Sequence, residues 1–297
     1  ADGHAIIVNS LALKLAGIDR STPDPIGGKI DKDANGEPNG VLIDKASSLV
    51  ESIIPKRTRE EEKRALREGL NRTAKMGWTQ LHDAGSPLSD YEILNELKKN
   101  EGLPVRIQFY VSDGEDGNKF LDEGPYLDPD HFLTSRGIKF YADGAIGSRG
   151  AAFFDKYDDY ETKGFLIFQK EETIPKLVKA LVNGIQIQTH AIGDLANKIT
   201  LDWYEEAFNK VSPENRIIEN PRWRVEHAQN IKPEDQQRYS DLEVIASMQP
   251  SHAIGDLHFA HKRLGEERLK DAYTWKKLIE LGVVVVGGSD APVEIGD

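Results

Sequence analysis

The sequence predicts an α/β protein built on a TIM-like (β/α)8 barrel that is one strand short. Two observations predict it. Seven short apolar runs alternate with amphipathic helical stretches, and nearly every apolar run ends in His, Asp, Lys or Gln. In a barrel the carboxyl ends of parallel strands converge on one mouth, where these polar residues would meet. An open doubly wound sheet is disfavoured because the G-x-G-x-x-G fingerprint after the first strand is missing.

The expected strands are short and rich in apolar residues. They are 78–82, 105–111, 138–142, 185–190, 223–227, 244–248 and 283–288. The helices expected between them have apolar residues three and four positions apart. They include 57–76, 171–183, 199–210 and 264–281. These units correspond to strands two to eight of an eight-stranded barrel.

The first sixty residues depart from this alternation. Residues 1–17 are expected to form a short helical piece, and residues 31–40 contain the Gly, Asn and Pro of a β-turn region. We therefore expect 1–60 to be a segment inserted into the barrel or covering its mouth. Because no internal repeat or low-complexity linker marks a second domain, 1–297 is treated as one partial barrel.

Composition excludes several classes of function. With 38 Lys and Arg against 50 Asp and Glu, the net charge of -12 and the lack of a basic cluster argue against nucleic acid as a partner. The absence of cysteine leaves only nitrogen and oxygen ligands for a metal ion. No apolar stretch is long enough to cross a membrane, and residues 1–10 lack the layout of a signal peptide. We therefore expect a cytoplasmic protein with no membrane partner.

Four residues at or near strand ends have side chains suited to a metal site: Lys139, His190, His227 and Asp290. Imidazole and carboxylate bind zinc and related cations when thiolate is absent. A lysine inside an apolar strand tends to be neutralised or modified, because burial disfavours its charge. Singly, each histidine is more often a hydrogen-bonded structural residue, and Asp290 could cap a helix. Their combination on separate strands favours a metal site.

Six strings along the chain support this interpretation. They are Asp-Gly-His (2–4) with Asn-Ser (9–10), Ala-Asp-Gly-Ala-Ile-Gly-Ser-Arg-Gly-Ala (142–151), His-Ala-Ile-Gly-Asp (190–194), Glu-His-Ala-Gln (226–229), Ser-Met-Gln-Pro-Ser-His (247–252) and Gly-Ser-Asp-Ala-Pro (288–292). Together they resemble the amidohydrolase family that contains N-substituted formamide deformylase and proteins named exoenzyme regulatory protein. The resemblance runs in order along the whole chain, but it is not specific for substrate.

The resemblance implies a (β/α)8 barrel flanked by a small β-sandwich, with one or two divalent cations at the barrel mouth. Zinc is expected, with iron or manganese as alternatives. By position, Lys139, His190, His227 and Asp290 match the ligands of the later strands, and the lysine is carbamylated in many such sites. The His-x-His pair of the family's first strand does not occur in these residues. We therefore expect a fragment that lacks the first strand and most of the sandwich.

The implied reaction is hydrolysis of a carbon-nitrogen bond in a small non-peptide amide, formamide or cyclic amide. Asp290 is the expected base, taking a proton from a metal-activated water and passing it to the leaving nitrogen. Five further residues are expected to contact substrate: His4, His82, Asp143, Arg149 and His252. Structural roles remain open alternatives, above all for His82, Asp143 and Arg149.

Other classes of function stay open. The chain could be a catalytically silent fragment or a binding or regulatory module, and the same barrel also supports phosphoester hydrolysis. A barrel without one strand has two unpaired edges and, we expect, an exposed apolar lumen, so the fragment should be marginal or completed by another chain, as in a homo-oligomer. We expect no hydrolysis by this chain alone, and metal-dependent turnover would contradict that.

Overall fold

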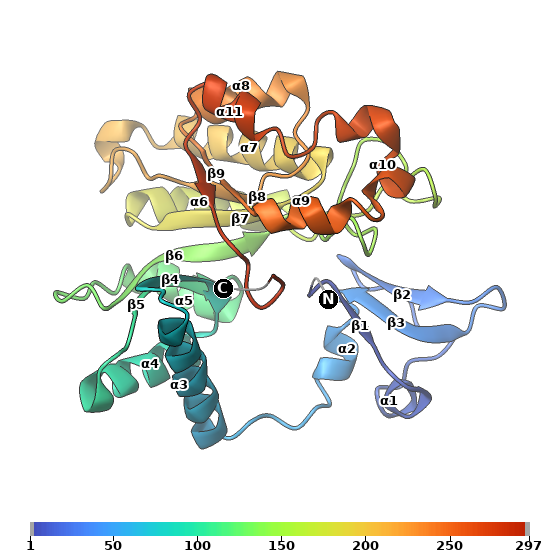
Figure 1. Cartoon of the computed structure of the whole chain (residues 1–297), viewed down its shortest axis with the longest axis horizontal. Coiled ribbons are helices and arrows are strands. Elements are labelled where there is room, and N and C mark those ends of the chain that lie inside the picture. Colours follow the sequence, from blue (N-terminus) through green and yellow to red (C-terminus); the bar gives the residue numbers. More distant parts are fainter. Residues whose placement is uncertain (1–2, 295–297) are drawn as a thin grey trace.

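The computed structural model describes residues 3–294 and contains two sheets (Figure 1). A parallel sheet with the order β10-β9-β8-β7-β6-β5-β4 curls into a partial barrel, and a small antiparallel sheet has the order β1-β3-β2. Within the described residues no ladder joins β10 to β4, so the barrel is open along that line. The expected seven-stranded partial TIM-like barrel is confirmed.

Each expected apolar run overlaps one strand of the barrel. The strands are β4 (Gln80–Ser86), β5 (Arg106–Ser112), β6 (Leu133–Tyr141), β7 (Gln186–Ala191), β8 (Arg224–His227), β9 (Ile245–Met248) and β10 (Val285–Gly287). The β6 strand begins earlier than expected because Ser135 pairs with both β5 and Tyr126. All neighbouring pairs are parallel, so the carboxyl ends of the strands share one edge.

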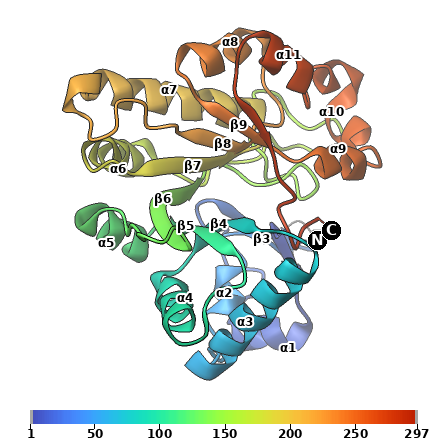
Figure 2. The ribbon, with the colours of Figure 1, turned by 60° about the vertical axis from the view of Figure 1, so that its left-hand side comes forward.

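Helices follow most of the strands and cover the outer face of the sheet. They are α3 (Arg59–Lys75), α4 (Leu88–Glu101), α5 (Glu115–Glu123), α6 (Lys170–Val182), α7 (Asp194–Lys210), the 3-10 turn η1 (Pro213–Asn215), α8 (Pro233–Asp241), α9 (Pro250–Asp256), α10 (Ala260–Leu269) and α11 (Trp275–Glu280). Figure 2 shows α6 and α7 lying along β7 and β8. None of the helices in residues 3–294 has both the length and the apolar character needed to span a bilayer.

The single helix expected over 264–281 is wrong, because the chain breaks between α10 and α11. Tyr273 has a φ of 54°, outside the helical region, and its N–H donates to the carbonyl of Gln229 at 2.8 Å. Ala272 forms an isolated bridge with Asn230. These bonds to the segment after β8 replace helical hydrogen bonds, so a tertiary contact overrides the local helical pattern.

The first sixty residues form their own small sheet. It contains β1 (Ala5–Ile7), β2 (Gly28–Lys32) and β3 (Pro38–Asp44), with the helices α1 (Ser10–Leu15) and α2 (Ser48–Glu51). The expected helical piece is therefore wrong over the strand β1 and confirmed over α1, and its residues 1 and 2 lie outside the described residues. The expected turn region contains the loop between β2 and β3.

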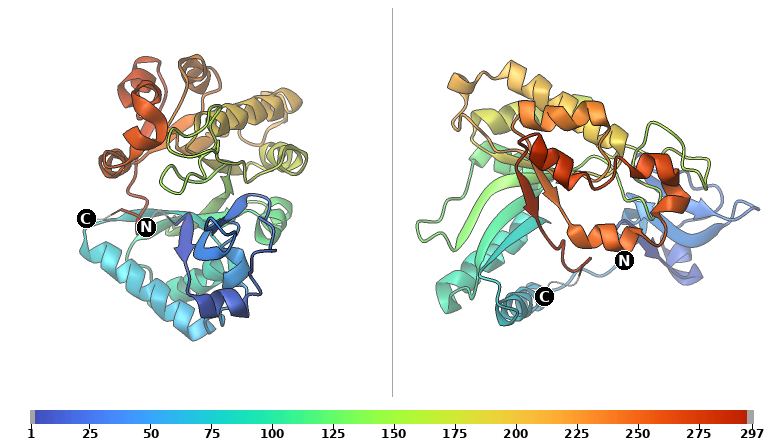
Figure 3. Two further views of the ribbon diagram at one scale, coloured as in Figure 1. Left: turned by 90° about the vertical axis from the view of Figure 1, so that its right-hand side faces the viewer. Right: turned by 45° about the horizontal axis from the view of Figure 1, so that its top comes forward.

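The small sheet lies beside the long loop that follows β6, residues 142–169, in both views of Figure 3. Lys45 donates to the carbonyl of Ile167 at 3.2 Å, and the ammonium of Lys29 lies 3.1 Å from the hydroxyl of Tyr160. The first sixty residues thus reach the carboxyl edge of the barrel through this loop.

The inner face of the barrel is polar, so the expected apolar lumen is wrong. Side chains alternate along each strand, and apolar ones such as Ile187 and Val225 face the helices, where the main core lies. The alternating positions on the other face include Gln188 and Arg224. The Arg224 Nε lies 2.8 Å from a carboxylate oxygen of Glu226, so these two charged groups of the lumen are paired with each other.

Gly85 sits in a β-bulge of β4 with a φ of 113°, and a Cβ there would lie 2.9 Å from Cγ of Lys139. We predict that Gly85→Ala lowers the free energy of unfolding by about 1–3 kcal/mol more than Gly77→Ala, because it adds overpacking to backbone strain. Gly77 has a φ of 90° but nothing within 4 Å of such a Cβ, so it reports the strain alone. Urea unfolding of both variants tests this, and equal losses would contradict the close approach.

Candidate active site

His190 and His227 come together at the carboxyl edge of the barrel. His190 is paired with Glu226 in the ladder between β7 and β8, and His227 ends β8 opposite Ala191. Their ring centroids are 4.5 Å apart, with planes at 69°. The residues are 1% and 7% exposed. The structure thus places two of the predicted metal ligands side by side, in a site closed to bulk water.

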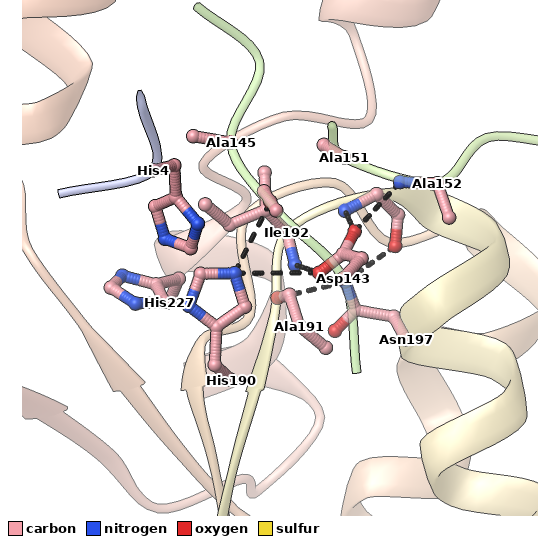
Figure 4. Close-up of polar contacts among 12 residues, drawn as sticks. His4, Asp143, Ala145, Ala151, Ala152, His190, Ala191, Ile192, Asn197 and His227 are labelled. Atoms are coloured by element: carbon pink, nitrogen blue, oxygen red, sulfur yellow. Dashed lines mark hydrogen bonds and ion pairs between the residues drawn. The ribbon is translucent and has the colours of Figure 1, made fainter. Parts of the chain in front are cut away.

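Two further imidazoles extend this pair into a row. The ring of His4, from the segment before β1, lies 4.8 Å from His190 (Figure 4). His252, in α9, stacks on the other side of His227 with centroids 5.5 Å apart and planes at 17°. The Nδ1 atom of His4 is 2.6 Å from an oxygen of Asp44 at the end of β3. Four histidines, from the segment before β1, from β7, from β8 and from α9, therefore converge at the mouth.

The protonation of the His190 ring follows from its neighbours. Its Nε2 lies 3.2 Å from the carbonyl oxygen of Gly144, which only accepts hydrogen bonds, so Nε2 carries the proton. An oxygen of Asp143 is 3.4 Å from the same nitrogen. The lone pair of the neutral ring is therefore on Nδ1.

Burial keeps both central imidazoles uncharged. It lowers the pKa of His190 well below the ordinary value of 6.5, and the neighbouring His227 adds to the shift. Burial likewise lowers the pKa of His227, with Lys139 as the next cause. Neutral imidazole is the form that binds a metal ion, so the environment prepares both rings as ligands.

Lys139 lies near these imidazoles on the inner face of β6 and is only 4% exposed. Its ammonium is 4.1 Å from the ring centroid of Tyr141, and no carboxylate of the described residues lies within 4.0 Å of it. A buried cation without an anionic partner is costly. Carbamylation would turn this amine into an anionic oxygen donor, so its setting fits a ligand of that kind.

Asp290 follows β10 and joins the row of imidazoles at its outer end. One of its oxygens is 3.8 Å from Nε2 of His252, and an oxygen of Glu294 is 3.7 Å from the same atom. That buried nitrogen has no hydrogen-bond partner in the part of the chain that the structure describes. Within residues 3–294, no three His, Asp or Glu side chains are arranged to hold a metal ion by themselves. The donor set seen here fits part of a metal site, and Asp290 stands at its outer end beside His252.

Asp143 is fully buried and binds backbone. Its carboxylate accepts N–H groups from Ala152 at 2.8 Å, Ile192 at 3.0 Å and Gly193 at 2.8 Å (Figure 4). Burial raises the pKa of Asp143 to about 7, against the lowering effect of these bonds. The residue joins the loop after β6 to the turn after β7, beside His190. A direct contact with substrate stays a prediction.

Arg149 and His82 lie away from the imidazole row. Arg149 makes a two-pronged contact with Asp159, at 3.0 Å from Nε and 2.9 Å from Nη2. His82 is in the middle of β4 on the inner face, with Nδ1 3.2 Å from Nη2 of Arg224. Both arrangements match the structural alternatives to substrate binding, and the binding roles stay predictions.

The sequence did not single out three residues that line the row. Gln249 contacts His227, Tyr141 lies 5.6 Å from His190 between ring centroids, and Glu294 faces His252. Tyr141 is two residues after Lys139, so strand alternation would have placed it on the same face. Gln249 stands within the string at 247–252, three residues before His252, which was selected. No local signal marked Glu294.

Acidification should destabilise the fold through the buried imidazoles. Below pH 6.5 the unfolded state binds a proton at each histidine that the folded state does not, so the free energy of unfolding falls as pH falls. We predict that His190→Gln flattens this dependence by up to about 1.4 kcal/mol per pH unit.

Urea unfolding of both proteins between pH 5 and 7.5 measures the effect. Asp143, with its raised pKa, contributes the opposite slope in this range because its folded form gains a proton as pH falls through 7. Because an oxygen of Asp143 lies 3.4 Å from Nε2 of His190, the comparison is repeated in an Asp143→Asn background, which removes this contribution from both proteins. Identical slopes for wild type and His190→Gln would show that the His190 ring is not held neutral.

Comparison with known proteins identifies the family of the chain. Residues 1–297 match the amidohydrolase family. YtcJ of Bacillus subtilis is 35% identical over 304 residues, covering 98% of this chain and 54% of that protein. N-substituted formamide deformylase of Arthrobacter pascens is 28% identical over 306 residues, covering 98% of this chain and 55% of that protein.

A solved structure shares the fold. An uncharacterized metal-dependent hydrolase from Pyrococcus horikoshii superposes with a TM-score of 0.76 at 26% identity, covering 99% of this chain and 56% of that one. The chain spans about half the length of the curated relatives it matches. Because the family matches the chain along its whole length, the chain belongs to the amidohydrolase family.

Proposed function

We propose that the protein is a metal-dependent hydrolase that cleaves carbon-nitrogen bonds in small non-peptide amides, formamides or cyclic amides. The observation that carries the proposal is the pair of buried, neutral imidazoles of His190 and His227 on adjacent strand ends, near the amine of Lys139, which has no carboxylate partner among residues 3–294. The choice of bond is supported by the similarity to N-substituted formamide deformylase. A carbon-nitrogen bond is thus preferred to a phosphoester.

The residues that would hold the cation are His190 through Nδ1, His227, Lys139 as its carbamate, and Asp290. Zinc suits this nitrogen and oxygen donor set, with iron or manganese as alternatives. A cation bound there would supply a Lewis acid that polarises the scissile carbonyl and lowers the pKa of water. The buried walls around the two histidines strengthen these electrostatic effects, because water does not screen them.

Asp290 is the residue we assign to proton transfer. Its side chain is 36% exposed at the mouth, so it can receive a proton from water and deliver it to the leaving nitrogen. The Nε2 atom of His252 is 3.8 Å from Asp290 and its ring stacks on that of His227, so His252 can orient both side chains. His4 closes the opposite end of the row next to His190. A small substrate would enter between these two ends.

Metal content gives the first test. We predict that the natural polypeptide containing these residues binds near-stoichiometric zinc, iron or manganese, and that His190→Ala combined with His227→Ala abolishes the binding. The double change His258→Ala with His261→Ala is the matched control, because both residues are exposed. Elemental analysis after dialysis measures the metal, and circular dichroism confirms that each protein is folded.

Metal that persists in the folded double variant would contradict the proposed site. A folded wild type without metal would contradict the metal-dependent reaction and favour a binding or regulatory protein.

The role of Asp290 is tested by Asp290→Asn in the same polypeptide. We predict a loss of kcat of about 10²- to 10⁴-fold on an amide or formamide substrate, because the amide side chain cannot accept the proton. Asp130→Asn, at a residue whose side chain is 77% exposed, is the control. Metal content is measured in parallel, and wild-type turnover by the Asp290 variant would exclude it as the base.

A further inference from the structure

Gln249 connects the strand ends of β8 and β9. It directly follows β9 and is 5% exposed. Its side-chain oxygen lies 2.7 Å from Nδ1 of His227, and its side-chain nitrogen lies 3.3 Å from the carbonyl oxygen of Ser247. Its main-chain carbonyl accepts the N–H of His252 at 3.1 Å. Gln249 thus contacts one imidazole of the row through its side chain and, through its main chain, holds the helix that carries another.

The orientation of this amide determines which nitrogen of His227 carries hydrogen. The carbonyl of Ser247 only accepts hydrogen bonds, so the NH2 group of Gln249 must face it. The amide oxygen then faces His227 and only accepts, so Nδ1 of the ring must be the donor. A neutral imidazole has a single N–H, which leaves the lone pair of His227 on Nε2.

We propose that Gln249 is a positioning residue that holds His227 in its Nδ1–H tautomer, so that Nε2 is the atom available to a metal ion. The assignment of a metal ligand rests on the proposed function, whereas the tautomer does not. In free histidine the Nε2–H form is the more stable one, so the bond to Gln249 works against the intrinsic preference of the ring.

The other histidine of the pair is controlled differently. His190 is oriented by a backbone carbonyl, that of Gly144, which no substitution removes. For His227 the corresponding acceptor is a side chain, so mutagenesis can remove it. His190 therefore serves as an internal reference within the same molecule.

The experiment uses 15N-histidine-labelled, metal-free protein of the full chain. Long-range 1H–15N correlation spectra distinguish the two tautomers of each ring. In wild type we expect Nδ1–H at His227 and Nε2–H at His190. In Gln249→Met, which keeps the side-chain length and loses the acceptor, His227 should shift to the Nε2–H form while His190 stays unchanged. Gln249→Glu keeps an acceptor and should keep Nδ1–H at His227.

Zinc titration of the natural polypeptide carrying the same substitutions gives the second readout. Loss of an outer hydrogen-bond partner of a metal-binding histidine typically weakens metal affinity about 10- to 100-fold. We expect a weakening in that range for Gln249→Met and wild-type affinity for Gln249→Glu. Gln237→Met, on the exposed face of α8, is the matched control and should change neither measurement.

An unchanged His227 tautomer in Gln249→Met, or an Nε2–H form in Gln249→Glu, would overturn the proposal. The second variant keeps the test decisive if the methionine variant fails to fold. If the tautomer responds as expected and the natural polypeptide binds no metal, the role of Gln249 stands and the proposed function fails, so the two are distinguished.

Discussion

The buried carboxylate of Asp143 is the constraint on which the mouth of the barrel depends. By accepting three backbone N–H groups, it fixes the loop after β6 against the turn after β7, and it lies beside the ring of His190. The adjacent carbonyl of Gly144 then selects the tautomer of that ring. The small sheet of the first sixty residues, which begins just after His4, contacts the same loop through Lys29 and Lys45. The imidazole row therefore rests on backbone geometry that a single buried acid organises.

The barrel strands could be predicted from sequence because each is a short apolar run with a polar end, and parallel pairing brings such ends to one edge. The same reasoning brought His190 and His227 together correctly. It did not anticipate the polar inner face, because alternation within short buried strands does not reveal which face meets the helices. It also missed the break at Tyr273, which depends on a bond to Gln229, and the strand β1, which is defined by its pairing with β3. These features arise from contacts between segments that are far apart in sequence.

The position and the charge of Lys139 together indicate a functional role for this residue. Its place in β6, between buried apolar neighbours, made it unusual in the sequence, and the structure leaves it without a carboxylate partner among the described residues. Most buried charges are paired, so an unpaired one points to chemistry that the polypeptide alone does not complete. Arg224 on the same inner face is the contrasting case, because Glu226 lies within 2.8 Å of it. A structural role accounts for the arginine and does not account for the lysine.

The bond between Tyr273 and Gln229 has a consequence for how homologous sequences can diverge. It ties the break between α10 and α11 to a residue two positions beyond His227, and a carboxylate of Asp256 accepts from both side chains. An insertion or deletion near Tyr273 would pull directly on the strand end that carries His227. Gly265, where the chain departs from helical geometry inside α10, packs against Asp158 of the loop after β6. The segment from α10 to Tyr273 is thus held at both ends by contacts to the mouth of the barrel, and its length should vary little among homologues.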